Sequence, residues 1–324
     1  MGYGSIGQRH ASNLTDFGAY DVSIVDPDPT RRAAAEASSA VNRSVNLNSI
    51  DYGSFAFGII AAPSSLHADL ARPFIEHETP VFIEKPLHHD LGPARRLAAE
   101  VDTVDVTTLV GCNMRFHPGL QTTRRLLRDR RVGDPLTATI VAGSYLPDWH
   151  PEEDYRQSYS ARSDLGGGVT LDAVHEINYA RWLFGEVNEV TAWIDHVSSL
   201  EIDTEDLAQL HLRFDSGVSA QLHLDYFHRP YRRGCHITTT DGCIDWDWSR
   251  ESVRWYDATA DRWAEESYAG WEVNQMYVDE LAHFLDCVRG EATSICDVHE
   301  GLADLRVVEA AKESSETGRR ITLA

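Results

Sequence analysis

Two polar residues with complementary acid–base chemistry stand three positions apart after a run of three glycines. Glycines 166–168 precede a segment that we expect to be helical as far as Phe184, and on that helix Asp172 and His175 share a face. A carboxylate beside an imidazole fixes the tautomer of the ring and raises its basicity, as a general base near neutral pH requires. Asn178 follows one helical turn later. The structural alternatives are that Asp172 caps a helix N-terminus and that His175 is a buried core histidine with its hydrogen bonds satisfied.

One lysine stands out because lysine is rare in this chain. Only two of the 29 basic residues are lysines, Lys85 and Lys312. Glu84, Lys85 and Pro86 follow the apolar run 81–83, at the carboxyl end of an expected strand, where open α/β sheets bind ligands. A partly desolvated lysine there can hydrogen-bond a substrate hydroxyl and exchange a proton with it. The alternative is a solvated surface lysine, but arginine serves nearly everywhere else in the chain.

The chain opens on a glycine pattern, GxGxxG. Its residues are Gly2, Gly4, Ser5, Ile6 and Gly7, with Tyr3 at the first variable position. The glycines allow a tight turn and close approach of the backbone to a pyrophosphate, which then sits on the N-terminus of the following helix. A flexible N-terminal turn is the structural alternative.

An acidic residue supports a dinucleotide site. Asp26 ends the apolar run 22–25, nineteen residues after Gly7, and is placed to accept hydrogen bonds from ribose hydroxyls. A carboxylate there repels a 2′-phosphate, so we expect NAD as the cofactor, while Arg31 nearby leaves NADP open. Because the motif begins at residue 2, the first, central strand has no room. We expect the upstream gene sequence to encode this strand, since a sheet without it leaves backbone groups unpaired.

The elements that position these residues fall into two patterns. The expected strands of the first lie at 22–25, 55–62, 80–83 and 107–111, and the expected helices at 31–39, 66–77 and 92–101. Apolar strands that alternate with helices predict a parallel sheet covered on both faces. After residue 118, period-two alternation and a turn at 215–217 predict an open antiparallel sheet with helices on one side. We therefore expect an α/β protein with a doubly wound Rossmann domain over 1–118 and an α+β domain over 119–324.

Taken together, these motifs resemble the Gfo/Idh/MocA family of oxidoreductases, named for glucose–fructose oxidoreductase, inositol dehydrogenase and a rhizopine-catabolism protein. The resemblance runs nearly end to end and adds to the motifs above Pro63, His67 and the segment 113–118. It implies hydride transfer at a carbon of a sugar, sugar derivative or nucleotide sugar, and a sheet that forms homodimers or homotetramers. The family often has an aspartate where this chain has Asn178, and an amide supplies no charge to a substrate.

The resemblance also implies roles for individual residues. The catalytic residues are expected to be Lys85, Asp172 and His175. The cofactor-binding residues are expected to be Gly2, Gly4, Ser5, Ile6, Gly7, Asp26, Arg31, Pro63, His67 and Glu84. The substrate residues are expected to be Arg115, Tyr155 and Asn178, of which Tyr155 belongs to an aromatic-rich loop. Such a loop suits a cover over a sugar, whose C–H faces stack on rings, although packing or a subunit contact explains it equally well.

Composition excludes several other classes of function. A formal charge of −22 argues against nucleic acid or an anionic membrane as partner, and no stretch approaches the ~18 apolar residues of a membrane span. Five scattered cysteines predict a reduced, cytoplasmic protein, and the absence of HExxH-like spacing predicts no metal. The high acidity and the scarcity of lysine favour a protein from a salt-rich cytoplasm. The alternative explanation is an ordinary acidic protein encoded by a GC-rich genome. The alternatives to a dehydrogenase are a non-catalytic sugar- or nucleotide-binding protein and an enzyme whose cofactor undergoes no net oxidation.

Overall fold

The chain forms two compact units in a computed structural model that describes residues 1–18 and 20–323. The first unit comprises Met1–Asn113 and Val273–Leu305, and the second comprises Met114–Glu272 and Arg306–Ala324. The division after residue 113 lies near the boundary expected at 118. Residues 119–324 do not form one continuous domain, however, because the segment 273–305 folds with the first unit.

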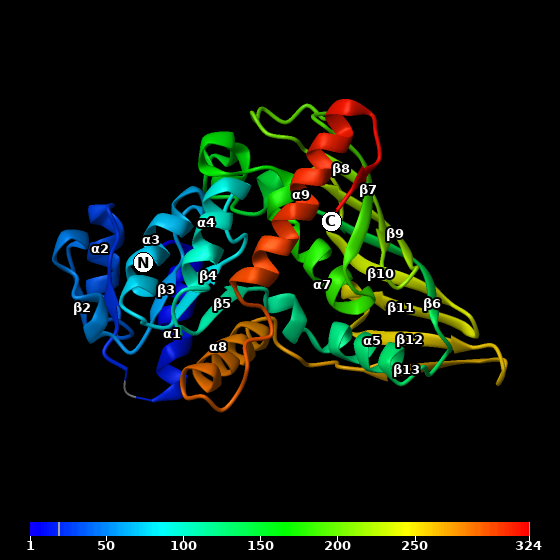
Figure 1. The fold of residues 1–324 in the computed structure, drawn as a ribbon, viewed down its shortest axis with the longest axis horizontal. Helices are drawn as coiled ribbons and strands as arrows, with labels where there is room; N and C mark the ends of the chain where they lie inside the picture. The colour runs from blue at the N-terminus through cyan, green and yellow to red at the C-terminus, as the bar shows by residue number, and fades with distance from the viewer. Residues whose placement is uncertain (19, 324) are drawn as a thin grey trace. The chain divides into compact units, whose positions relative to one another are not determined.

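The first unit holds two parallel sheets. One pairs β1 (Ser23–Ile24) with β2 (Arg43–Ser44), and the other has the order β3 (Gly58–Ile60), β4 (Val81–Glu84), β5 (Thr108–Gly111). The helices of this unit are α1 (Ser5–Leu14), α2 (Pro29–Glu36), α3 (His67–Glu76), α4 (Leu91–Val101), α8 (Gln275–Val288) and the first part of α9 (Val298–Thr317) (Figure 1). The strands and helices expected from the sequence are therefore present, although β1, β3 and β5 are shorter than expected and β2 was not expected.

Both faces of the three-stranded sheet are covered. On one face, Phe82 of β4 and Leu109 of β5 belong to one buried cluster with Leu14 of α1 and with Leu281 and Phe284 of α8. On the other face, α3 lies against β3 and α9 lies against β5. Strands buried on both faces carry continuous apolar runs, which is the pattern that predicted them. The predicted doubly wound α/β architecture is confirmed, and the apolar face of α8 explains why 273–305 joins this unit.

Met1 and Gly2 lie between the ends of the two parallel sheets. The amide of Gly2 donates a hydrogen bond to the carbonyl of Val25 at 2.8 Å, and the amide of Ala61 donates one to the carbonyl of Met1 at 2.7 Å. These two residues therefore bridge the ends of β1 and β3 where a central strand of a Rossmann sheet runs. Along the rest of their length β1 and β3 belong to separate sheets. The expected upstream strand stays a prediction.

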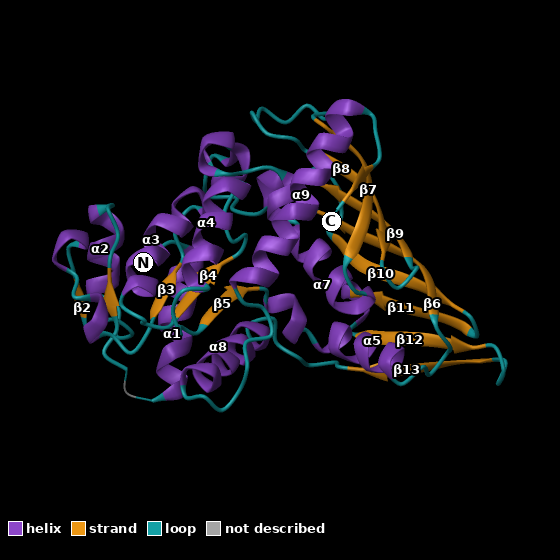
Figure 2. Ribbon diagram, in the orientation of Figure 1, coloured by secondary structure: helices purple, strands orange, loops and turns teal. Residues whose placement is uncertain are grey.

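The second unit is built on one nine-stranded sheet, with the order β13-β12-β11-β10-β6-β9-β8-β7-β14. The strands are β6 (Pro135–Gly143), β7 (Val187–Asp195), β8 (Leu207–Phe214), β9 (Ser219–Asp225), β10 (Arg232–Thr239), β11 (Gly242–Asp247), β12 (Ser252–Asp257), β13 (Arg262–Ser267) and β14 (Ile321–Thr322). Helices α5 (Pro118–Arg128), α6 (Val169–Asp172), α7 (Val174–Phe184) and the rest of α9 lie on one face (Figure 2). Along β8, buried and exposed side chains alternate strictly, so the opposite face is open to solvent.

Two features of this sheet differ from the sequence-based expectation. First, β6 and β9 pair in parallel, because the chain passes through α6, α7 and the β7–β8 hairpin before it returns beside β6. Second, β11 to β14 were not expected. Strand β13 lies at one edge of the sheet and is largely exposed, and β12 beside it is buried only at Ser252 and Val253. Neither strand therefore shows the apolar alternation that marks a half-buried strand.

Candidate functional site

The glycine-rich turn has the geometry of an anion cradle. Gly2 has φ +88°, and a Cβ atom there would lie 2.4 Å from the carbonyl oxygen of Ala61, so only glycine fits. A Cβ atom at Gly7 would lie 2.2 Å from the carbonyl oxygen of Gly2, which shows how closely α1 packs on the turn. A Cβ atom at Gly4, by contrast, would meet no neighbouring atom closer than one of Arg31 at 4.0 Å. The side of the turn that faces a ligand is therefore open.

The start of α1 completes this cradle. The helix begins at Ser5 and its N-cap is Gly4, which has no side chain with which to cap the first amide groups. Its first turn carries no acidic residue, so the positive end of the helix dipole is not neutralised there. Amide groups of the first turn, which includes Ser5 and Ile6, suit the pyrophosphate of a dinucleotide. The residues present fit that cofactor.

Asp26 is a buried carboxylate that organises the turn. Its Oδ2 accepts a hydrogen bond from the amide of Tyr3 at 2.7 Å, and its Oδ1 accepts one from the amide of Asp28 at 2.8 Å. An Nη atom of Arg31 lies 3.9 Å from Oδ2. A carboxylate has about four acceptor sites, so these contacts leave capacity for ribose hydroxyls. Contact with the cofactor by Asp26 and Arg31 stays a prediction.

Glu84 is held by a neighbouring histidine at the end of β4. Its Oε1 lies 2.7 Å from Nε2 of the buried His10, and its Oε2 accepts a hydrogen bond from the amide of Lys85 at 3.2 Å. Lys85 follows β4 directly and is half-buried, as the position at the strand end predicted. The His10–Glu84 pair therefore fixes the backbone from which the Lys85 side chain starts.

A second carboxyl lies in this region, and sequence analysis missed it. Glu280 of α8 is 1% exposed, and neither of its carboxyl oxygens has a hydrogen-bond partner among the described residues. Burial, followed by repulsion from Glu84 and Cys296, raises the pKa of Glu280 well above its usual range. The signal in the sequence that could have identified Glu280 is its position beside Leu281, on the apolar face of a helix.

His67 links the loops that follow β3 and β4. Its Nδ1 lies 2.8 Å from the carbonyl oxygen of Pro86, and its Nε2 lies 2.8 Å from that of Ala62, next to Pro63. Burial lowers the pKa of His67. This geometry gives His67 a role in positioning the two loops, and direct contacts of His67 and Pro63 with the cofactor stay predictions.

Asp172 and His175 lie in the second unit, on either side of a break in the helix. The expected continuous helix is divided at Ala173 into α6 and α7, and Asp172 is the last residue of α6, so it does not cap a helix N-terminus. Its Oδ2 accepts a hydrogen bond from the hydroxyl of Tyr226 at 2.5 Å. His175, in the first turn of α7, is 8% exposed. Tyr226 was missed from the sequence because it stands 54 residues away, just after β9.

The glycine run holds α6 in place. Gly168 has φ +112°, and a Cβ atom there would lie 2.5 Å from the carboxylate of Glu205. That carboxylate accepts a hydrogen bond from the amide of Thr170 at 3.1 Å, in the first turn of α6. A Cβ atom at Gly167 would lie 2.4 Å from the carbonyl oxygen of Tyr159. The glycines thus let a loop and an acidic side chain approach the start of the helix that ends at Asp172.

The residues expected to contact substrate are found in two places in the second unit. Nε of Arg115 donates a hydrogen bond to Oδ1 of Asn178 at 2.8 Å, and both residues are buried. The hydroxyl of Tyr155 accepts a hydrogen bond from the amide of Glu201 at 3.2 Å, within the expected aromatic loop. In that loop the exposed ring of Trp149 lies 5.5 Å from the ring of Tyr226. An aromatic surface therefore lies beside the tyrosine that holds Asp172, and substrate contacts stay predictions.

The glycine-rich turn at the start of α1 fits a dinucleotide, and comparisons with known proteins agree with this. Residues 1–112 match the model of the oxidoreductase family with an NAD-binding Rossmann fold, and residues 120–245 match the GFO/IDH/MocA C-terminal domain. The chain belongs to the Gfo/Idh/MocA family, as the sequence motifs predicted.

Several relatives match the chain over its whole length. D-apiose dehydrogenase of Paraburkholderia graminis is 26% identical over 100% of this chain and 88% of that protein. Myo-inositol 2-dehydrogenase of Thermotoga maritima is 26% identical over 100% of this chain and 97% of that protein. Among solved structures, levoglucosan dehydrogenase with NADH has a TM-score of 0.89 at 18% identity, covering 100% of this chain and 97% of that chain. The WlbA dehydrogenase of Bordetella pertussis with NADH and UDP-GlcNAcA has a TM-score of 0.83 at 21% identity, covering 100% and 96%. At these identities the structural matches establish the fold.

No helix within residues 1–18 and 20–323 is both long enough and apolar enough to cross a membrane.

Proposed function

We propose that this chain transfers hydride between a nicotinamide cofactor and a hydroxyl-bearing carbon of a sugar, a sugar derivative or a nucleotide sugar. The observation that carries the proposal is the arrangement in the second unit, where Asp172 is held by a buried tyrosine hydroxyl three residues before the buried His175. The names of relatives such as D-apiose dehydrogenase and myo-inositol 2-dehydrogenase support this substrate class.

In this proposal three side chains handle the proton of the substrate hydroxyl. When bound, the nicotinamide ring accepts the hydride in oxidation and donates it in reduction. His175 removes the proton from the hydroxyl whose carbon loses the hydride, and Asp172 orients the imidazole and stabilises its charged form. Lys85 donates a hydrogen bond to the same oxygen and polarises it. In reduction His175 returns the proton.

We propose NAD as the preferred cofactor, held by the glycine turn and by Asp26. The buried carboxylate of Asp26 disfavours the 2′-phosphate of NADP. The half-exposed Arg31, whose guanidinium lies near Asp26, could bind that phosphate, so NADP is the weaker alternative. Measuring kcat/KM with NAD and with NADP tests the preference, which we expect to favour NAD.

Replacement of Lys85 by alanine tests the catalytic assignment. We expect turnover to fall by about 10² or more, as when a positioned acid–base group is removed. Lys312→Ala is the matched control, because the other lysine of the chain pairs with Glu309 on α9 at 3.4 Å. Turnover is followed as NADH absorbance with a panel of sugars and polyols. Near-normal turnover of Lys85→Ala would refute the assignment of this lysine.

The alternative classes of function give different outcomes in the same assays. A non-catalytic binding protein gives no change in NADH absorbance with any sugar and no stabilisation of the fold by NAD. An enzyme whose cofactor undergoes no net oxidation retains that cofactor through purification.

We also propose that the protein is a cytoplasmic homo-oligomer adapted to high salt. No disulfide joins the five cysteines in the described part of the chain, as expected in a reducing compartment. The charge of −22 is screened at high ionic strength. Sedimentation and activity in low and molar KCl test the oligomeric state and the salt adaptation, with assembly and turnover expected to increase with salt.

A further inference from the structure

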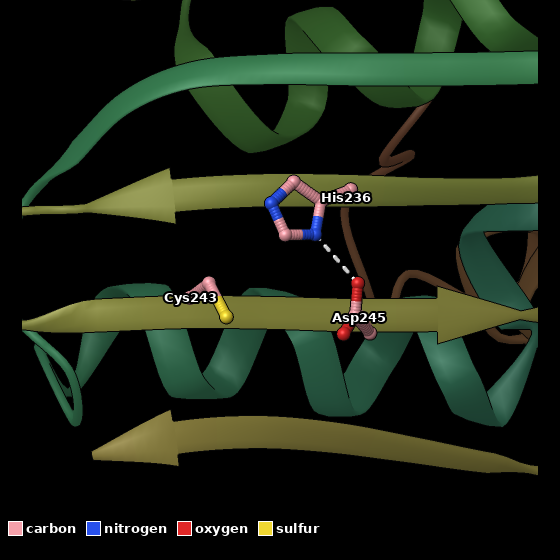
Figure 3. Close-up of side chains that lie close together, drawn as sticks. All are labelled: His236, Cys243 and Asp245. Carbon is pink, nitrogen blue, oxygen red and sulfur yellow. Dashed lines mark hydrogen bonds and ion pairs between the residues drawn. The ribbon is translucent and has the colours of Figure 1, made fainter. Parts of the chain in front are cut away.

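A mixed set of metal-binding side chains lies on the open face of the nine-stranded sheet, outside the residues assigned to hydride transfer. His236 belongs to β10, and Cys243 and Asp245 belong to the next strand, β11 (Figure 3). The antiparallel register places His236 directly opposite Asp245, and Cys243 lies two residues before Asp245 on the same face. The intervening Ile237 and Ile244 are buried, so the three polar side chains point away from the core.

The three donors lie near enough to one another for a single ion to reach all of them. One ligand atom from each residue lies within 4.8 Å of the other two, and Nδ1 of His236 is 2.6 Å from Oδ1 of Asp245. Zinc–ligand bonds of about 2.0–2.3 Å place tetrahedral ligand atoms roughly 3.5 Å apart. The sheet ladder fixes the backbone, and the side chains of His236 and Asp245 are 49% and 34% exposed, so small changes of side-chain rotamer suffice.

The donor chemistry indicates the kind of ion. Hard cations such as Mg²⁺ and Ca²⁺ require oxygen ligands, whereas imidazole nitrogen with thiolate sulfur suits Zn²⁺ and similar transition metals. We propose that His236, Cys243 and Asp245 bind one divalent transition-metal ion, with Zn²⁺ as the preferred ion and one coordination position left open. Arg254 lies opposite Asp245 on β12, and its guanidinium lies over the ring of Trp263 at 4.5 Å. It therefore has a partner of its own.

Binding at this site depends on deprotonation of the thiol. Zn²⁺ binds the thiolate form, so binding releases the thiol proton. No metal was expected from the sequence because ligand spacings along one helix or loop are absent. These three ligands come together only across the β10–β11 hairpin.

The test is a zinc titration of the full-length chain. After chelator treatment and dialysis, Zn²⁺ is added against a chromophoric competitor, and bound metal is counted by mass spectrometry. We expect one ion per chain, and at least about a tenfold loss of affinity in Cys243→Ala and in His236→Ala. His211→Ala is the matched control, since this exposed histidine lies on the same face in β8 and its loss leaves affinity unchanged.

Cobalt provides a second readout that is specific for the thiolate. Co²⁺ bound to the unmodified chain gives a sulfur-to-metal charge-transfer absorption, which is absent in Cys243→Ala. The proposal is overturned if the unmodified chain binds no zinc, if both variants bind as tightly as the unmodified chain, or if His211→Ala weakens binding equally. Circular dichroism shows whether each variant is folded. If only one of Cys243→Ala and His236→Ala folds, that variant alone is enough to test the proposal. Dehydrogenase activity is not used, so this result is independent of the proposed function.

Discussion

The buried Glu280 leads to a pH-dependent prediction for stability. The perturbation is Glu280→Gln, which removes the titratable group and keeps the shape of the side chain. Because burial and the nearby Glu84 raise the pKa of Glu280 well above its ordinary value of 4.5, the folded protein keeps this carboxyl protonated where the unfolded chain ionises it. Below that value both states are protonated, and the group contributes no pH dependence.

The magnitude follows from proton linkage. In the pH range between the unfolded and folded pKa values of Glu280, the folded state binds one more proton, so the unmodified protein loses about 1.4 kcal/mol of stability per pH unit as pH rises. Glutamine has no such dependence. The free energy of unfolding of Glu280→Gln minus that of the unmodified protein therefore increases by about 1.4 kcal/mol per pH unit. The buried amide adds a cost of about 1–3 kcal/mol that is independent of pH, so the slope is diagnostic and the value at one pH is not.

The assay is urea unfolding followed by circular dichroism at several pH values between about 5 and 7. Glu76→Gln, at an exposed position of α3, controls for the loss of one surface carboxylate. Parallel stability curves for Glu280→Gln and the unmodified protein would refute the reasoning, because they would mean that Glu280 ionises equally in both states.

Two further changes test the second unit. Tyr226→Phe removes the hydroxyl that donates to Asp172. We expect kcat to fall by at least about tenfold and its pH profile to shift, with the fold retained. An unchanged pH profile would show that Tyr226 has no part in the proton-transfer step. Arg233→Ala removes the partner of the fully buried Glu176, which neighbours His175 on α7, and leaves a buried charge unpaired. We expect about 3–5 kcal/mol of destabilisation in denaturant unfolding, with the conservative Arg233→Lys restoring part of it; a loss under 1 kcal/mol would contradict this.

The sequence predicted the architecture best where apolar periodicity was strong. The alternation along β8 and β9 and the continuous runs of β3 to β5 correspond to observed strands, because burial on one or both faces dictates those patterns. The break between α6 and α7 escaped prediction because a single residue, Ala173, leaves helical periodicity nearly intact.

Candidate site residues could be proposed from the sequence when their signal was local. The glycine pattern and the spacing of Asp172 and His175 can be found by inspection, since each lies within a short segment. Tyr226 and Glu280 could not be assigned in this way, because their environments are made by residues distant in the chain. The zinc ligands proposed here likewise meet only through strand register.

The discontinuity of the first unit has a consequence for synthesis on the ribosome. Its sheet needs Leu281 and Phe284 of α8 to cover Phe82, and these residues emerge only after the strands β6 to β13. The dinucleotide-binding unit therefore cannot complete its fold until residues 273–305 have been synthesised, although most of it is encoded first. Until then the early strands keep one apolar face uncovered, which exposes the nascent chain to aggregation during that interval.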